Sequence, residues 1–188
     1  VWNILRISLT SNPLEQSYTT RLHRWYEEQR GCLFVDLRYA LVNDLCYEIP
    51  MIEDSSLLKT LNPKRGTRIE ECIRTQNKHD IYFKTIAYNF ISVSDKTPPC
   101  FYPNKKDAPQ TGIGRVGADT DEWRRMLLLL FSGEIYFAKW CTFGDDFHYT
   151  KGELMDFRFP FDELTTSDKK KLLALSAEWS KRADSTIQ

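Results

Sequence analysis

The stretch with the most potential for chemistry is FGDDFHYTKGELMDFRFP, residues 143–160. Within it, Asp145, Asp146 and His148 are residue types that bind divalent cations or transfer protons. Hard cations need several oxygen ligands, and two adjacent carboxylates with one imidazole supply only part of a ligand shell. The other histidines, His23 and His79, are distant in the sequence. A metal site built from this stretch alone is therefore not expected.

A structural interpretation of the same residues is favoured. Asp145 is expected in a turn, because aspartate tolerates unusual backbone geometry and accepts hydrogen bonds from nearby backbone groups. Asp146 or Thr150 would then cap the short helix that follows. A hydrogen bond would hold His148 in place. On this interpretation the stretch is a support for other groups.

A second stretch, GIGRVG at residues 112–117, has the G-x-G-x-x-G spacing of dinucleotide-binding loops. In those loops a strand leads into the turn, whereas here the proline-broken segment PPCFYPNKKDAPQT comes first. We therefore expect a flexible loop before a buried helix. Lys105, Lys106 and Arg115 flank exposed backbone N–H groups in this loop and could meet a phosphate chain.

No other motif indicates a self-sufficient catalytic site. The sequence has no GxSxG and no Walker motif, and its five cysteines lack CxxC spacing. Their odd number and wide spacing argue against zinc and against a disulfide framework, and favour reduced thiols in a cytoplasm. Asp168 and Lys170 match part of a nuclease D-x-K motif, but they lie at a predicted helix start, so we treat the match as coincidence.

Composition sets outer limits on function. A chain of 188 residues suits one domain, or a domain with an added lobe. The net charge of +0 means that nucleic-acid binding would need a local basic patch. The longest apolar run, MLLLLF at residues 126–131, is far shorter than the roughly 20 residues that cross a bilayer. We therefore expect no membrane partner.

The elements of the first half can be predicted from periodicity. Residues 4–10 and 32–42 have the alternation of strands, and between them a helix is predicted with a cap at Asn12 and an end at Gly31. The apolar face of that helix would consist of Leu14, Tyr18, Leu22 and Trp25. A strand, a helix and a strand in this order predict a right-handed crossover and a partly parallel sheet.

In the second half, residues 81–93 predict one long strand, and the prolines and glycines of residues 95–118 predict a loop. Three helices follow: a buried one at 120–131 with a capping box from Asp119 to Glu122, one at 133–142 capped by Ser132, and one at 165–182 capped by Thr165 or Ser167.

The first turn of the last predicted helix carries Lys169, Lys170 and Lys171, where the helix dipole disfavours cations. Their position hints at a surface that serves a partner. A solvated helix face is the favoured explanation.

Residues 126–161 read MLLLLFSGEIYFAKWCTFGDDFHYTKGELMDFRFPF. A buried helix is followed by an aromatic helix, a Gly-Asp turn with an aromatic residue and His148, a short helix opened by Lys151, and the strand FRFPF. This order resembles the C-terminal part of adenine-specific DNA methyltransferases from restriction–modification systems. Gly133 after Ser132, and Asp146 in the turn, depart from the family pattern.

The resemblance extends to the front half of the chain. Residues 7–42 are similar to the strand–helix–strand that follows the catalytic loop in that family, and residues 81–93 resemble the segment that joins its two lobes. It implies an α/β fold with a mixed sheet and flanking helices. Residues 1–94 would be the remainder of a methyltransferase-like lobe, and residues 95–188 a helical and loop-rich DNA-recognition region.

The catalytic motifs of the family are not in this sequence. The Gly-rich turn that binds S-adenosylmethionine and the Asn-Pro-Pro-aromatic motif that holds the flipped adenine have no counterpart, since Asn12–Pro13 and Asn62–Pro63 are followed by Leu14 and Lys64. We expect the catalytic half to lie upstream of Val1. No cofactor is expected on these residues, and S-adenosylmethionine is expected for the full-length protein.

The expected function is DNA binding and target recognition for such a methyltransferase, without catalysis by this chain. A base must leave the duplex stack to be methylated, which needs a surface that grips phosphates and reads base edges. Double-stranded DNA is the expected partner, together with other restriction–modification subunits, in the cytoplasm. Simple surface exposure is the competing explanation for each candidate DNA-binding residue: Lys105, Lys106, Arg115, Lys139, Trp140, His148 and Lys151.

Two alternatives stay open. The chain could be a protein-interaction module that docks another subunit through the apolar helix at 120–131. It could also be a nucleotide-binding enzyme that uses Gly112–Gly117.

Overall fold

In a computed structural model of the protein, the residues described are 17–23, 26–32, 34–35, 37–42, 49–73, 79–87, 90–100, 102–103, 111–145 and 147–186. The predicted strand at residues 4–10 and the Asn12 cap lie outside them. The chain forms two compact units, Val1–Leu58 and Lys59–Gln188, and each is described by itself.

The first unit contains a small two-stranded sheet. Strand β1 (Ser17–Thr19) pairs antiparallel with β2 (Ala40–Val42), and Tyr18 lies opposite Leu41. Two short 3₁₀ helices, Glu27–Cys32 and Ser55–Leu57, complete its regular structure among the described residues. The Thr19 hydroxyl is buried and donates to the carbonyl of Pro50 at 2.5 Å. This bond joins β1 to the segment that follows β2.

The helix predicted between Asn12 and Gly31 is wrong where the chain is described, because residues 17–19 form β1 and residues 27–32 form a 3₁₀ helix. Tyrosine and threonine in this stretch favour strands, and pairing with β2 outweighs the local helical spacing. The strand predicted at 32–42 is confirmed only at residues 40–42. The parallel crossover was predicted between residues 4–10 and 32–42, and its first strand lies outside the described residues; the pair that is described, β1 and β2, runs antiparallel.

The elements that follow are, in chain order, α1 (Leu58–Leu61), β3 (Thr67–Arg68), β4 (His79–Lys84), β5 (Val93–Ser94), β6 (Ile113–Ala118), α2 (Asp121–Phe131), α3 (Glu134–Phe143), α4 (Lys151–Met155), β7 (Arg158–Phe159) and α5 (Thr166–Thr186). Short 3₁₀ helices at Ile69–Cys72 and Phe161–Glu163 follow β3 and β7. The α/β class expected from the sequence is therefore confirmed.

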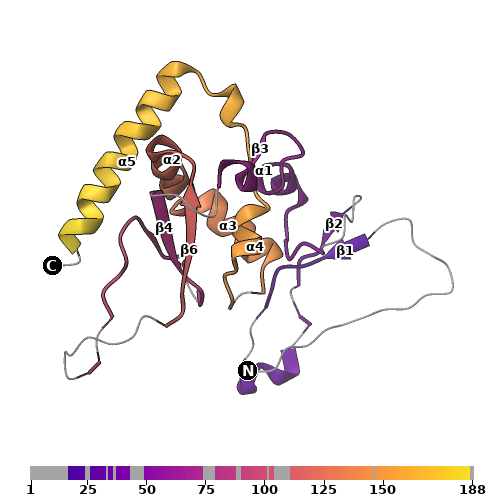
Figure 1. The fold of residues 1–188 in the computed structure, drawn as a ribbon. Coiled ribbons are helices and arrows are strands. Elements are labelled where there is room, and N and C mark those ends of the chain that lie inside the picture. Colours follow the sequence, from indigo (N-terminus) through magenta and orange to yellow (C-terminus); the bar gives the residue numbers. More distant parts are fainter. Residues whose placement is uncertain are drawn as a thin grey trace. The chain divides into compact units, whose positions relative to one another are not determined.

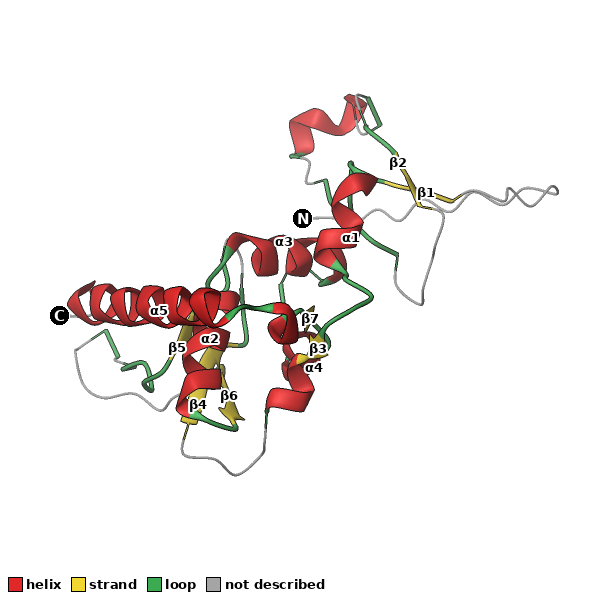
Figure 2. Cartoon of the chain, turned by 90° about the horizontal axis from the view of Figure 1, so that it is seen from above, coloured by secondary structure: helices red, strands yellow, loops and turns green. Residues whose placement is uncertain are grey.

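An antiparallel sheet in the order β5-β4-β6 forms the base of the core of the second unit. Its core face carries buried Ile81, Phe83, Val93 and Val116. Helix α2 contacts this sheet on one side and α5 on the other, as Figures 1 and 2 show. Every strand pair of the described residues is antiparallel, so the partly parallel sheet expected from the sequence is not found there.

Two predictions about this sheet are wrong. In place of the single strand predicted at 81–93 there are two: β4 ends at Lys84 and pairs antiparallel with β5, which begins at Val93. The loop predicted at 95–118 ends in a strand, because residues 113–118 form β6 and pair with the whole of β4. The glycines of β6 resembled a loop, but a cross-strand aromatic ring occupies the space beside one of them, as described below.

The predicted helices of the second half are confirmed to within a few residues at their ends. Their caps differ in part. The Thr120 hydroxyl, and not Asp119, accepts a hydrogen bond from the backbone N–H of Trp123 at 3.1 Å and begins α2. Ser132 donates to the Leu128 carbonyl at 2.8 Å and does not cap α3, which starts after Gly133.

Helix α2 is the central helix of the second unit. Its apolar side chains Met126, Leu127, Leu128 and Phe131 are buried in the core. Docking of another subunit through this helix, one of the alternatives above, would therefore require the unit to open. Among the described residues no single helix is long and apolar enough to cross a membrane, although α2 and α3 reach that length and composition together, bent by 64° at their junction.

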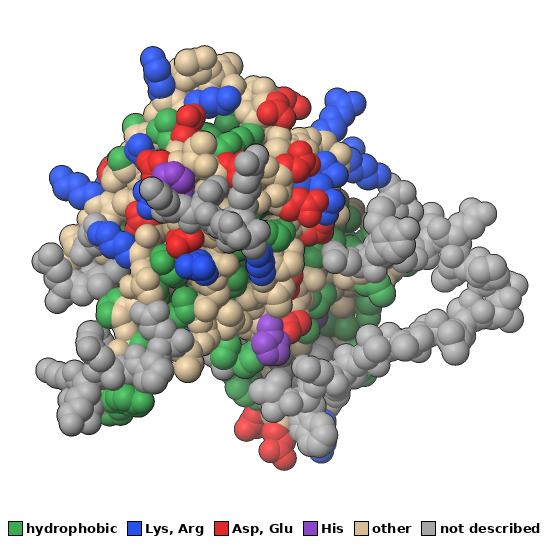
Figure 3. Space-filling view, viewed as in Figure 1, with side chains coloured by type: hydrophobic (Ala, Val, Ile, Leu, Met, Phe, Trp, Pro, Cys, Tyr) green, Lys and Arg blue, Asp and Glu red, His purple; other side chains and the backbone are tan. Residues whose placement is uncertain are grey.

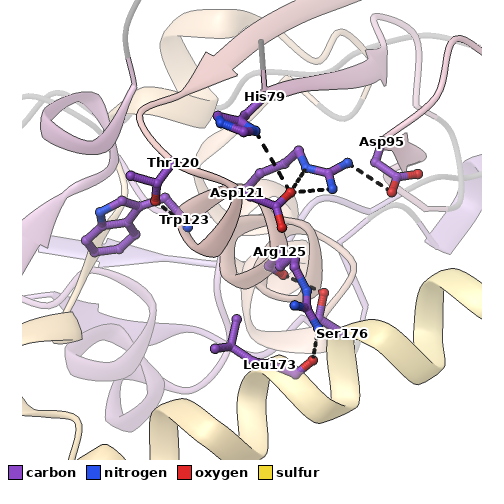
Figure 4. A network of polar contacts seen from close by, with 9 residues as sticks. His79, Asp95, Thr120, Asp121, Trp123, Arg125, Leu173 and Ser176 are labelled. Atoms are coloured by element: carbon purple, nitrogen blue, oxygen red, sulfur yellow. Dashed lines mark hydrogen bonds and ion pairs between the residues drawn. The ribbon is translucent and has the colours of Figure 1, made fainter. Parts of the chain in front are cut away.

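A network of polar contacts fixes α5 to α2 (Figure 4). The Arg125 guanidinium donates to the carbonyl of Leu173 at 2.7 Å, and the fully buried Ser176 hydroxyl donates to the carbonyl of Arg125 at 2.8 Å. Arg124 joins Asp121 of the same helix to Asp95, which follows β5. The position of α5 is thus set by bonds to backbone carbonyls as well as by apolar contact.

Candidate functional site

The Asp145 carboxylate organises the turn that precedes α4. One carboxylate oxygen accepts hydrogen bonds from the backbone N–H groups of Phe147 at 2.9 Å and of His148 at 2.6 Å. The other oxygen lies 2.5 Å from Nδ1 of His148. Partial burial raises the pKa of this carboxyl, but the hydrogen bonds from His148 and Phe147 outweigh that effect and leave its pKa below the ordinary value. The turn predicted around Asp145 and His148 is confirmed.

This turn leaves two side chains at the surface. The His148 side chain is 61% exposed although its Nδ1 is held by Asp145, and Phe147 is exposed beside it. The two rings meet edge to face with centroids 4.7 Å apart. Thr150 then caps α4 through a capping box with Glu153, one of the two caps predicted from the sequence.

Backbone hydrogen bonds connect the turn to the end of β4. Ala87 N–H donates to the Phe147 carbonyl at 2.9 Å, and Tyr149 N–H donates to the Thr85 carbonyl at 2.9 Å. Thr85 N–H in turn donates to the Gly112 carbonyl at 2.8 Å. Thr85 is therefore the point where the GIGRVG stretch, the end of β4 and the turn at 145–150 meet. We call this arrangement the Thr85 junction.

A buried aromatic cluster supports the Thr85 junction from below. The Tyr149 hydroxyl donates to the Tyr136 hydroxyl at 3.0 Å, and the latter reaches the Glu153 carbonyl at 3.4 Å. Burial raises the pKa of both phenols well above the ordinary value, so both stay protonated. Phe83 meets Tyr149 edge to face with centroids 5.2 Å apart. The turn is thus supported by a packed aromatic cluster whose two phenols stay protonated.

Residues 113–117 of the GIGRVG stretch lie in strand β6 and do not form a phosphate-binding loop. Gly114 lies opposite Phe83 in the β4–β6 pairing. A Cβ on Gly114 would meet the tip of the Phe83 ring, with Cε1 at 2.8 Å and two ring atoms closer still. The glycine is explained by this contact, and the ring occupies the space that a phosphate chain would need. The nucleotide-binding alternative does not fit this geometry.

The predicted DNA-binding residues fall into three groups. Lys105 and Lys106 lie outside the described residues. Arg115, His148 and Lys151 are exposed, and His148 and Lys151 flank the same short turn. Arg115 lies on β6 with its guanidinium 3.5 Å from the Asp80 carboxylate. Their role in DNA binding stays a prediction.

Lys139 and Trp140 form the third group and are buried. The Lys139 ammonium lies over the Phe157 ring, 5.6 Å from its centroid. The Trp140 indole N–H donates to the carbonyl of His148 at 3.0 Å. Trp140 therefore supports the turn from inside, Lys139 packs against Phe157, and direct contact with a partner would fall to the exposed group.

The described residues offer no metal centre. Among them, no group of three or more His, Cys, Asp or Glu side chains is placed to hold a metal ion. Asp145 and His148 bind each other, and Asp146 is not among the residues described. The Asp168 carboxylate, part of the apparent D-x-K motif, accepts from the Thr165 N–H and hydroxyl at the start of α5.

Sequence reasoning missed Thr85, Ile86 and Ala87 as the support of the turn. The run IYFKTIAYNFISV contained a signal in its length, because thirteen residues exceed a typical strand and call for a break. Phe147 was not among the predicted DNA-binding residues. Its exposure beside His148 distinguishes it from the other aromatic residues of this stretch.

Charge does not single out one region of the visible surface. Figure 3 shows Lys and Arg side chains interspersed with Asp and Glu over the described part of this face.

Comparison of the chain with known protein families, with curated proteins and with solved structures finds no match.

Proposed function

We propose that this chain is the DNA-binding and target-recognition part of an adenine-specific DNA methyltransferase of a restriction–modification system. In this proposal another region supplies the catalytic groups and S-adenosylmethionine, and the finer methyltransferase-like architecture of residues 1–94 belongs to the proposal as well. The cytoplasm, where DNA is accessible, is the proposed compartment. Support comes from the resemblance of residues 126–161 and from one observation at the Thr85 junction.

That observation is the hydrogen-bonded turn at residues 145–150, which presents Phe147 and His148 together at the surface. An exposed aromatic ring can stack on an unpaired base, and an imidazole can bond to a base edge or a phosphate. Lys151, three residues after His148, adds a cation at the first position of α4. The Asp145 bonds and the indole bond of Trp140 fix this turn before any ligand arrives. Such preorganisation lowers the entropy cost of binding.

No cofactor is proposed for the residues that the structure describes. Of Gly112–Gly117, the glycine-rich stretch closest to a nucleotide fingerprint, residues 113–117 lie in β6, and Gly114 is in contact with Phe83. No chemical step is therefore assigned to this chain. Its proposed contribution is to hold the duplex and to receive or exclude bases around the one that is extruded.

The test is the salt dependence of duplex DNA binding by the full 188-residue chain, followed by fluorescence anisotropy. Each phosphate contact makes the negative slope of log affinity against log salt steeper by about 0.9. Lys151→Gln should reduce the slope by about that amount, whereas Lys59→Gln, an exposed lysine of α1, should leave it unchanged. Phe147→Ala should weaken binding by roughly 1–3 kcal/mol if the ring stacks on a base.

The matched apolar control is Ile135→Ala, which truncates an exposed side chain at the start of α3. No measurable binding of duplex DNA by the wild-type chain at low salt would refute the proposal. If the Lys151 and Lys59 changes had equal effects on the salt slope, the turn at 145–150 would not be the DNA-binding site.

A second candidate is a protein-interaction module, favoured by one observation in the first unit. That unit exposes a series of large apolar side chains: Tyr18, Leu22, Tyr26, Phe34, Val35, Tyr39, Ile49 and Leu57. Where such side chains gather into one contiguous patch, they are typical of an association surface. Analytical ultracentrifugation over a hundredfold concentration range tests it. Sedimentation of the chain that does not depend on its concentration would dismiss this candidate.

A further inference from the structure

Helix α5 has one face on the core and one in solvent. On the inner face Ser176 is fully buried, and Leu173 and Trp179 pack against the core. The outer face consists of exposed residues, namely Lys170, Lys171, Ala174, Leu175, Ala177, Glu178, Lys181 and Arg182. The proposed function assigned no role to this outer face.

The charges on the outer face are distributed in two pairs. Lys170 and Lys171 lie in the first two turns, and Lys181 and Arg182 lie near the end of the helix. Eleven residues separate Lys170 from Lys181, which corresponds to about 16 Å at 1.5 Å per residue. The acidic residue between the pairs, Glu178, is engaged by Arg182 at 2.5 Å. Lys170 and Lys171 at one end and Lys181 at the other are thus the two cationic ends, and between them Glu178 and Arg182 offset each other's charge.

Helix stability does not explain the first pair. Both lysines lie beyond the first turn, to which the effect of the helix dipole is confined, and the cap of α5 is supplied by Thr165 and Asp168 instead. The side chains between the pairs include the small residues Ala174 and Ala177, which allow a close approach to the helix backbone. In Figure 3, Lys and Arg side chains project along the edge of the molecule where α5 runs in Figure 1.

We infer that the outer face of α5 binds the phosphodiester backbone of duplex DNA, with its two cationic ends on the two strands that border one groove. The major groove is about 12 Å wide between its bordering strands. A rise of about 16 Å with flexible lysine side chains at each end matches that groove and the phosphates at its edges. This inference rests on the proposed function, for which it names a second contact surface, distinct from the turn at 145–150.

The attachment of α5 to α2 keeps the two cationic ends at a constant spacing. The bonds that join Arg125 to Leu173 and Ser176 lie at the middle of the helix, and both use backbone carbonyls (Figure 4). A helix fixed in this way loses little further freedom on binding. The spacing is therefore a property of the free protein.

The test compares two double variants of the full chain that remove the same charge. Lys170→Gln with Lys181→Gln removes one cation from each end of α5, and Lys59→Gln with Arg65→Gln removes two exposed cations from α1 and the turn before β3. Loss of two phosphate contacts should reduce the salt slope by about 1.8 and weaken binding about 60-fold at 0.1 M salt. The control pair should change neither. Circular dichroism and melting curves check that both variants are folded.

The possible results separate this inference from the proposed function. If the wild-type chain does not bind duplex DNA, the proposed function fails and this inference fails with it. If the wild type binds and the α5 pair behaves like the control pair, the inference is overturned while the proposed function stands. A wild-type chain that self-associates, and becomes monomeric on Leu175→Ser, would mean that a second copy covers this face and would also overturn the inference.

Discussion

Replacement of Gly114 by alanine tests whether the GIGRVG stretch serves packing or phosphate binding. The added Cβ would meet the tip of the Phe83 ring at distances below 3 Å. Phe83 is 3% exposed and lies edge-on to Tyr149, so the ring has little space in which to move. Overpacking of this kind costs about 1–3 kcal/mol, and the stiffer alanine backbone offsets about 0.5–1 kcal/mol of it. We expect a net loss of about 0.5–2 kcal/mol.

Thermal unfolding measures the effect, which corresponds to a fall in Tm of roughly 2–7 °C for a unit of this size. Phe83→Leu shortens the ring that causes the clash, so Gly114→Ala should cost less in that background. The double-mutant cycle should give a coupling free energy of about 1 kcal/mol. Equal costs of Gly114→Ala in both backgrounds would refute the packing explanation. So would a rise in the wild-type Tm on addition of NAD or ATP, because a ligand of the native state stabilises it by mass action.

Three further predictions concern the turn and the last helix. Gly144→Ala would place a Cβ 2.6 Å from a backbone carbonyl of α3 and should cost about 1–3 kcal/mol in urea unfolding, while Gly152→Ala, an exposed helical position, should stabilise by about 0.5–1 kcal/mol. The folded-state pKa of Asp145 lies below its ordinary value of 3.8. Its stabilisation should therefore be complete above about pH 4 and lost as the pH falls through the folded pKa; Asp145→Asn should remove that acid-sensitive part of the Tm profile. Thr165→Ala should cost about 1 kcal/mol through loss of the α5 cap, whereas Ser167→Ala should cost almost nothing in the same unfolding assay.

Local signals explain which elements could be predicted. The helices at 121–131 and 166–186 have apolar periodicity and nearby capping residues, which act over one or two turns, whereas the helix at 134–143 begins after Gly133 without a side-chain cap. The Asp145 turn and the Thr150 cap were likewise readable, because both depend on residues at most three positions apart.

Long-range pairing explains the failures. Nothing near Ser17–Thr19 in the sequence announces β2 as its partner, so the helical spacing of its apolar residues was misleading. The glycines of residues 112–117 resembled a loop because Phe83, the ring that requires Gly114, is distant along the chain. The same limit applied to Lys139 and Trp140, whose types favour a surface role but whose helix face turns into the core.

The pairing of β3 with β7 has a consequence for how the protein is made. Gly66, in a left-handed backbone conformation with φ of 102°, receives the Arg158 guanidinium on its carbonyl across 92 positions of sequence. Arg68 reaches Asp156 across 88 positions, and Thr67 reaches Asp162 across 95. Contacts between such distant positions form late and slow the search for the native state. A nascent chain leaving the ribosome therefore holds residues 66–69 without their partners until residue 162 has emerged. Premature termination before that point should give an aggregation-prone product, because residues 66–69 would lack the partners with which they pair.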